Sequence, residues 1–197
     1  MPDSLRDPSF EEKVQILWEE RQIMDALHRY SRGFDRGDVE LAKSAYWPDA
    51  LDDHHVVCGL AHPMCDFFDA LIEERYESTQ HHITNTRIEI DGTTAHAESY
   101  CFAVSTKRET LELEIIGGRY VRRLEKRNGE WRIAAAVLVA DWSLDADTTR
   151  DLIETGASAA RDRSDSSYQR PLVVTRERTD LSSSAPSEGV DPAARRR

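Results

Sequence analysis

The stretch that decides the fold is residues 88–104, which read IEIDGTTAHAESYCFAV. The pattern on both sides of Asp91-Gly92 has a period of two, and an Asp-Gly pair between such segments is a strong β-hairpin signal. We therefore predict an antiparallel hairpin formed by strands over 80–91 and 94–105.

A second hairpin is predicted further along the chain. Asn128-Gly129 separates segments 111–125 and 130–142, which are rich in β-branched and aromatic residues. Four long strands in succession predict an antiparallel meander. Gly117-Gly118 lies inside the third strand pattern and predicts a bulge or bend there.

Helices are predicted upstream of this sheet. Apolar residues over 16–34 recur at the spacing of one helix face: Ile16, Ile23, Leu27, Tyr30 and Phe34. A short helix over 39–45, a short strand within 49–58 and a third helix over 61–76 follow. Helices first and a meander afterwards predict an α+β fold, in which a curved antiparallel sheet wraps around the N-terminal helices.

The charge divides the chain into two parts. The whole sequence of 197 residues carries a formal charge of −11, and residues 151–197 contribute nothing to it because they hold eight basic and eight acidic residues. An acidic body disfavours nucleic acid, an anionic membrane surface and an anionic substrate. We expect an extension over 1–9, a domain over 10–147, and an appendage over 148–197 that holds a short helix at 148–160 and is mostly disordered from 164 onward.

Targeting signals and metal motifs are not evident. No apolar run approaches the roughly 18 residues needed to span a bilayer, and the N-terminal residues do not form a secretory signal. The three cysteines, Cys58, Cys65 and Cys101, have no CxxC spacing. These features favour a cytoplasmic protein without a metal site.

Three side chains could bring chemistry into the interior. Asp35 lies at the rim of the apolar face near the end of the first helix, and Tyr30 lies on that face. Alternation sends His81 and His82 to opposite faces of their strand, so only one of them points inward. Each feature alone also fits a structural role: a solvated helix-end carboxylate, a packed tyrosine, or a satisfied core histidine.

Three segments carry a resemblance to a known family. They are Arg29-Tyr30 with Phe34 to Asp38, Thr79 to Asn85, and Gly129 to Ile133. In this order, over roughly residues 10–145, the chain resembles the SnoaL-like branch of the nuclear transport factor 2 superfamily. The resemblance implies a cone-shaped α+β barrel with a pocket between the helices and the concave face of the sheet, and a homodimer or homotrimer.

The same resemblance implies roles for individual residues. It is similar to scytalone dehydratase, hexachlorocyclohexane dehydrochlorinase and bile-acid 7α-dehydratase, in which a helix-end Asp orients a His that serves as base. Asp35 and His81 match that pair, and Tyr30 matches a pocket tyrosine of the dehydratases. Further pocket residues are expected to be these: Phe34, Trp47, His54 and Tyr100.

Two departures from the relatives make their particular substrates less fitting. Tyr100 stands where scytalone dehydratase has a second pocket histidine, and Tyr30 stands where the dehydrochlorinase has a lysine. We therefore expect a cofactor-independent lyase acting on a mainly apolar small molecule such as a steroid, polyketide or aromatic catabolite. The alternatives are an isomerase or cyclase with the same dyad, or a non-catalytic ligand-binding or oligomeric subunit. The dyad requires a His81 ring nitrogen within about 3.2 Å of an Asp35 oxygen.

Overall fold

The computed structural model describes residues 7–54, 57–146, 161–164 and 168. The elements within these ranges follow the order expected for an α+β fold. They are α1 (Phe10–Asp35), α2 (Val39–Ser44), β1 (Tyr46–Asp53), β2 (Cys58–Leu60), α3 (Ala61–Arg75), β3 (Tyr76–Asp91), β4 (Thr94–Lys107), β5 (Leu113–Arg127) and β6 (Glu130–Ala146).

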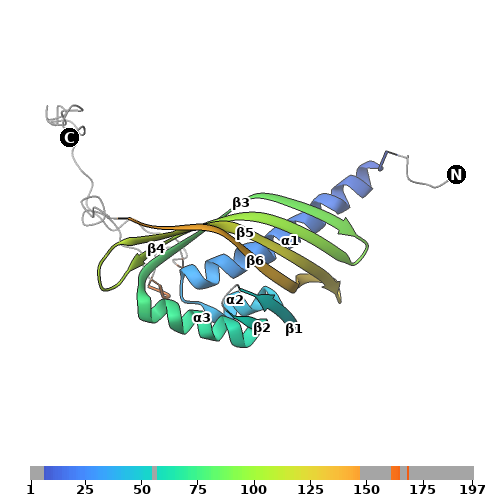
Figure 1. The fold of residues 1–197 in the computed structure, drawn as a ribbon. Helices are drawn as coiled ribbons and strands as arrows, with labels where there is room; N and C mark the ends of the chain where they lie inside the picture. Colours follow the sequence, from blue (N-terminus) through green and yellow to red (C-terminus); the bar gives the residue numbers. More distant parts are fainter. Residues whose placement is uncertain (1–6, 55–56, 147–160, 165–167, 169–197) are drawn as a thin grey trace, which may run out of the picture.

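The strands form one six-stranded sheet in the order β2-β1-β6-β5-β4-β3. The long strands arch over the three helices (Figure 1), and the sheet stays open rather than closing into a barrel. Four of the strand pairs are antiparallel, but β1 runs parallel to β6, so the sheet is mixed. A parallel pair is possible here because β1 and β6 are not consecutive in the chain, so no hairpin joins them.

Local sequence explains where α1 begins and ends. Ser9 is the N-cap: its hydroxyl accepts from the Glu12 backbone N–H at 3.2 Å, and its own N–H donates to the Glu12 carboxylate at 2.6 Å. The helix ends before Gly37, whose φ of +60° is a conformation that favours glycine. The last residue of the helix is Asp35, which places this carboxylate beside the sheet.

The buried face of α1 is shorter than the predicted one. Ile23, Leu27, Tyr30 and Phe34 are buried, but Ile16 is 45% exposed. The first turns of the helix extend beyond the part that lies under the sheet (Figure 1). The helical spacing was therefore right, whereas the sheet covers only its C-terminal half.

Two other expectations changed in detail. The predicted single strand within 49–58 is a pair, β1 and β2, which are antiparallel to each other. The β5–β6 register shifts at Gly117/Gly118, which confirms the predicted bulge. The helix predicted over 148–160 lies outside the described residues, as does most of the segment predicted to be disordered.

The core lies between α1 and the concave face of the sheet. Trp131, Tyr46, Leu124 and Ile133 have almost no exposed surface and pack with the buried face of α1. Among the residues described, no helix is both long and apolar enough to cross a membrane. The inward residues of the strands also line the space described next.

Candidate active site

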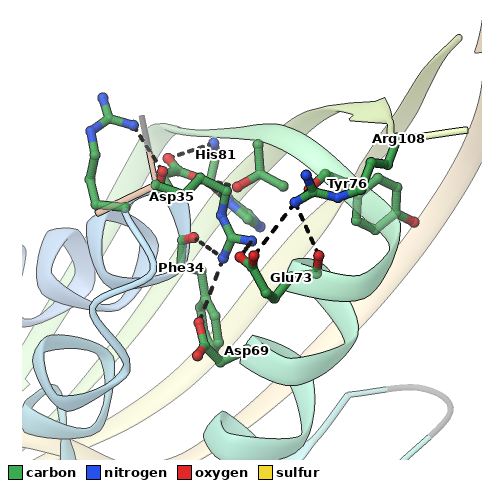
Figure 2. Close-up of polar contacts among 10 residues, drawn as sticks. Phe34, Asp35, Asp69, Glu73, Tyr76, His81 and Arg108 are labelled. Atoms are coloured by element: carbon green, nitrogen blue, oxygen red, sulfur yellow. Dashed lines mark hydrogen bonds and ion pairs between the residues drawn. The ribbon is translucent and has the colours of Figure 1, made fainter. Parts of the chain in front are cut away.

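The Asp35 carboxylate and the His81 imidazole meet where α1 ends beside the start of β3 (Figure 2). The His81 ring Nδ1 lies 2.6 Å from Asp35 Oδ1. The His81 backbone N–H donates to Asp35 Oδ2 at 3.0 Å, and the Thr79 hydroxyl donates to Oδ1 at 3.2 Å. A carboxylate only accepts hydrogen bonds, so in the neutral imidazole Nδ1 carries the proton and Nε2 keeps its lone pair.

Strand alternation decides which histidine takes part. The His81 side chain is 14% exposed, whereas the next residue, His82, is exposed and its ring lies near Phe102. Two consecutive residues of a strand point to opposite faces. His81 is consequently the member of the pair that faces the interior.

A cavity of about 270 Å³ opens beside the dyad. His81 and Thr79 line it, together with apolar side chains from α1, α3 and the sheet: Phe34, Phe68, Leu71, Ile72, Ile116 and Leu138. The other lining residues carry polar groups, and two pairs of them contact each other, Tyr30 with Tyr120 and Tyr76 with Glu114: His54, Tyr30, Tyr120, Cys101, Ser105, Tyr76 and Glu114. A mainly apolar hollow with few polar groups is typical of a small-molecule site.

Tyr30 and Tyr120 form a phenol pair in this cavity. Their hydroxyl oxygens lie 3.5 Å apart and their rings pack edge to face. Burial, with smaller contributions from neighbouring phenols and Asp52, raises the pKa of Tyr30 well above its usual value of 10.0. The Tyr30 phenol therefore stays neutral and can donate a hydrogen bond, but it cannot serve as a base.

The remaining predicted pocket residues divide into two groups. Phe34 and His54 line the cavity. Tyr100 does not: it is 48% exposed, because its neighbours Ser99 and Cys101 occupy the inward positions of β4. The placement of Tyr100 in the pocket must therefore be corrected.

The predicted placement of Trp47 in the pocket must be corrected in the same way. It lies outside the cavity lining, and its indole N–H donates to the Glu125 backbone carbonyl at 2.9 Å. The Arg127 and Arg132 guanidinium groups lie over the Trp47 ring at 5.0 and 4.9 Å. These contacts hold the indole against β5 and β6.

Several residues of the site were missed in the sequence. Tyr120 of β5 lines the cavity, the buried Arg122 of the same strand lies over its ring, and the buried Asp52 of β1 contacts the lining residue His54. The alternation of β5 contained the signal for Tyr120, but no register was available to say which face was inward. Among the described residues, no three His, Cys, Asp or Glu side chains are grouped as metal ligands.

Comparison with known proteins decides the family. Residues 15–137 match the model of the SnoaL-like domain, which is more than half of the chain. The chain belongs to the SnoaL-like domain family. The matched span of this SnoaL-like chain begins in α1 and ends in β6, so it contains both Asp35 and His81. No curated protein matches the chain.

Solved structures share the fold at low sequence identity. A candidate scytalone dehydratase from Novosphingobium aromaticivorans DSM 12444 is 19% identical with a TM-score of 0.63, covering 70% of this chain and 93% of its own. A hexachlorocyclohexane dehydrochlorinase from Novosphingobium barchaimii LL02 is 16% identical with a TM-score of 0.63, over 70% and 96%. A protein of unknown function from Mycobacterium tuberculosis is 22% identical with a TM-score of 0.60, over 68% and 78%.

Proposed function

We propose that this SnoaL-like chain is a cofactor-independent lyase that eliminates water, or a related leaving group, from a mainly apolar small molecule. The observation that carries the proposal is the 2.6 Å contact between His81 Nδ1 and Asp35 Oδ1 at the wall of an apolar cavity. This arrangement leaves Nε2 of His81 as a base facing the ligand space. Two of the structural neighbours, a dehydrochlorinase and a candidate dehydratase, are named for eliminations.

The reaction begins with proton removal from carbon. Nε2 of His81 takes a proton from a carbon next to an activating carbonyl, and the C–H electron pair moves into the new double bond. Asp35 holds the ring in the required tautomer and stabilises the imidazolium as it forms. The Tyr30 and Tyr120 hydroxyls donate hydrogen bonds to a developing enolate oxygen.

The cavity favours a particular class of substrate. Its volume of about 270 Å³ fits one or two rings, so a longer substrate such as a steroid would project through the mouth. The net charge of −11 disfavours the approach of an anion. A neutral β-hydroxy ketone with one or two rings, of aromatic or polyketide type, meets both conditions, whereas a steroid meets the charge condition and fits only in part.

The proposal is tested by product analysis with the full chain. We expect the wild type to dehydrate at least one member of a panel of cyclic β-hydroxy ketones, with loss of water detected by mass spectrometry. His81→Ala is expected to lower kcat by about 10²–10⁴-fold, the contribution typical of a general base. The matched control His82→Ala alters the outward neighbour and should leave kcat unchanged.

Two results would change the assignment. Turnover that survives His81→Ala undiminished would remove the proposed base. If the product has the same mass as the substrate and is no longer formed by His81→Ala, the same dyad would belong to an isomerase.

A further inference from the structure

A second imidazole faces the same cavity and has its own carboxylate. His54 lines the cavity, and its Nδ1 lies 3.3 Å from Asp52 Oδ1. Asp52 is 4% exposed, and the Tyr46 hydroxyl donates to its other oxygen, Oδ2, at 2.5 Å. Nδ1 of His54 therefore points toward the carboxylate, and Nε2 is left for the cavity.

The two histidines enter the cavity from different sides. His54 follows the last residue of β1, whereas His81 lies in β3. Strands β6, β5 and β4 separate β1 from β3 in the sheet, so the two imidazoles reach the cavity from well-separated parts of the fold. Both imidazoles line one cavity, so a ligand bound there can contact both.

Aromatic contacts hold the His54 ring in place. Its centroid lies 4.7 Å from that of Phe68, 5.8 Å from Tyr120 and 6.5 Å from Tyr30. These three rings come from α3, β5 and α1 and also line the cavity. The His54 ring is thus fixed by packing as well as by Asp52.

The buried charges balance around this second pair. In the part of the chain that the structure describes, Asp52 and Arg122 are the charged residues in the buried class. The Arg122 guanidinium makes no hydrogen bond to a described residue, and it lies over the Tyr120 ring at 4.0 Å and the Tyr30 ring at 5.0 Å. The buried class thus contains one acidic and one basic residue.

The titratable and charged groups around the His54–Asp52 pair come from four elements. They are Tyr46 from β1, Tyr30 from α1, Cys65 from α3, and Tyr120 and Arg122 from β5.

We propose that His54, held by Asp52, is the general acid of this site and stands opposite the base His81. The proposal rests on the proposed elimination. When His81 takes the proton from carbon and the double bond forms, the C–O bond breaks and its electron pair goes to oxygen. That oxygen takes the Nε2 proton of His54 and leaves as water. His81 ends protonated and His54 neutral, and exchange with solvent restores both.

An imidazolium suits this role better than the neighbouring phenol. Burial raises the pKa of Tyr30 well above its usual value, which makes it a weak proton donor at neutral pH. The imidazolium of His54 carries a proton on Nε2, and its loss leaves the neutral tautomer in which Nδ1 keeps its proton toward Asp52. Tyr30 then serves as a hydrogen-bond donor and His54 as the proton donor.

A comparison of leaving groups tests the role of His54. His54→Asn keeps an N–H near the position of Nδ1 for Asp52 and removes the Nε2 donor. We expect this variant to lower kcat for a β-hydroxy ketone by about 10²-fold or more. The kcat for the matching β-halo ketone should stay unchanged, because a halide ion leaves without taking up a proton. His81→Ala should slow both substrates, and His28→Asn, at an exposed histidine of α1, should slow neither.

If His54→Asn lowers kcat equally for both substrates, His54 has a structural role and the proposal is overturned. A kcat for dehydration that is unchanged in His54→Asn would overturn it as well. Failure of the wild type to turn over either substrate counts against the lyase function itself. Wild-type turnover of both substrates that His54→Asn does not change counts only against the general-acid role of His54. The two failures are therefore distinguishable.

Nitrogen NMR tests the second pair without any substrate. In the full chain labelled with ¹⁵N-histidine, we expect neutral His54 to carry its proton on Nδ1, in the tautomer that Asp52 fixes. Asp52→Asn should shift the His54 ring signals and leave those of His81 in place. A neutral His54 with its proton on Nε2, or signals indifferent to Asp52→Asn, would overturn the pair.

Discussion

Glu19 is the residue that ties the middle of α1 to β5 and β6, the two central strands of the sheet. Its carboxylate accepts from Lys126 Nζ of β5 at 2.8 Å, from the Trp131 indole of β6 at 3.2 Å, and from Gln15 at 2.8 Å. Burial alone would raise the pKa of Glu19, but these donors outweigh it and lower the pKa below its usual value of 4.5. The ionised carboxylate therefore stabilises the fold.

We expect Glu19→Gln to lower the free energy of unfolding at neutral pH by about 1–3 kcal/mol, as for hydrogen bonds to a charged group. Because the folded pKa is depressed, this stability is present above the unfolded pKa and is lost as the pH falls through the folded one. Urea unfolding between neutral pH and about pH 3 should show the two proteins converging. Glu20→Gln is the control on the same turn, and an equal loss there would contradict the prediction.

The dyad could be predicted residue by residue, whereas its surroundings could not. The helix periodicity placed Asp35 at the rim of the apolar face, and alternation showed that only one of His81 and His82 points inward. The family resemblance then selected His81. Asp52 and Arg122 gave no such signal, because charged residues in strands are normally exposed. Their burial depends on the registry between strands that are distant in sequence, which no local pattern contains.

At the scale of elements, the bulge between β5 and β6 depends on Gly118. A Cβ added at this position would lie 2.5 Å from the Val139 carbonyl oxygen and 3.2 Å from Ala140 Cα. Both are backbone atoms of β6, so they cannot rotate away as a side chain could. The sequence predicted this bulge from its paired glycines, but the partner strand that requires them became visible only in the structure.

We expect Gly118→Ala to destabilise the chain by about 1–3 kcal/mol, the usual cost of overpacking. The denaturant midpoint should fall with little change in slope. Gly59→Ala in β2 is the matched control, since nothing lies within 4 Å of a Cβ added there. A Gly118→Ala protein as stable as the Gly59→Ala protein would show that β6 yields easily at this point.

At the scale of the whole molecule, a residue from the C-terminal part of the sequence closes the junction between α1 and α3. The Arg161 side chain is 7% exposed, and its guanidinium donates to the Phe34 carbonyl at 3.1 Å and to the Glu73 carboxylate at 3.2 Å. Asp69 lies 3.6 Å away. The sequence divided the chain near residue 148 by charge, and it gave no indication that a later arginine packs beside the carboxylate of the dyad.

We expect Arg161→Met to lower the free energy of unfolding by about 1–3 kcal/mol, because charge-assisted hydrogen bonds are lost. Burial raises the pKa of Asp69, and Arg161 opposes that rise. Without Arg161 the pKa of Asp69 rises further, so its carboxylate destabilises the fold most at pH values above that pKa. The loss in free energy of unfolding should grow from acid to neutral pH, as measured by denaturant unfolding.

Arg163→Met is the matched control, because the Arg163 side chain is 82% exposed. An Arg161→Met protein that unfolds like Arg163→Met at every pH would mean that the contact stabilises nothing.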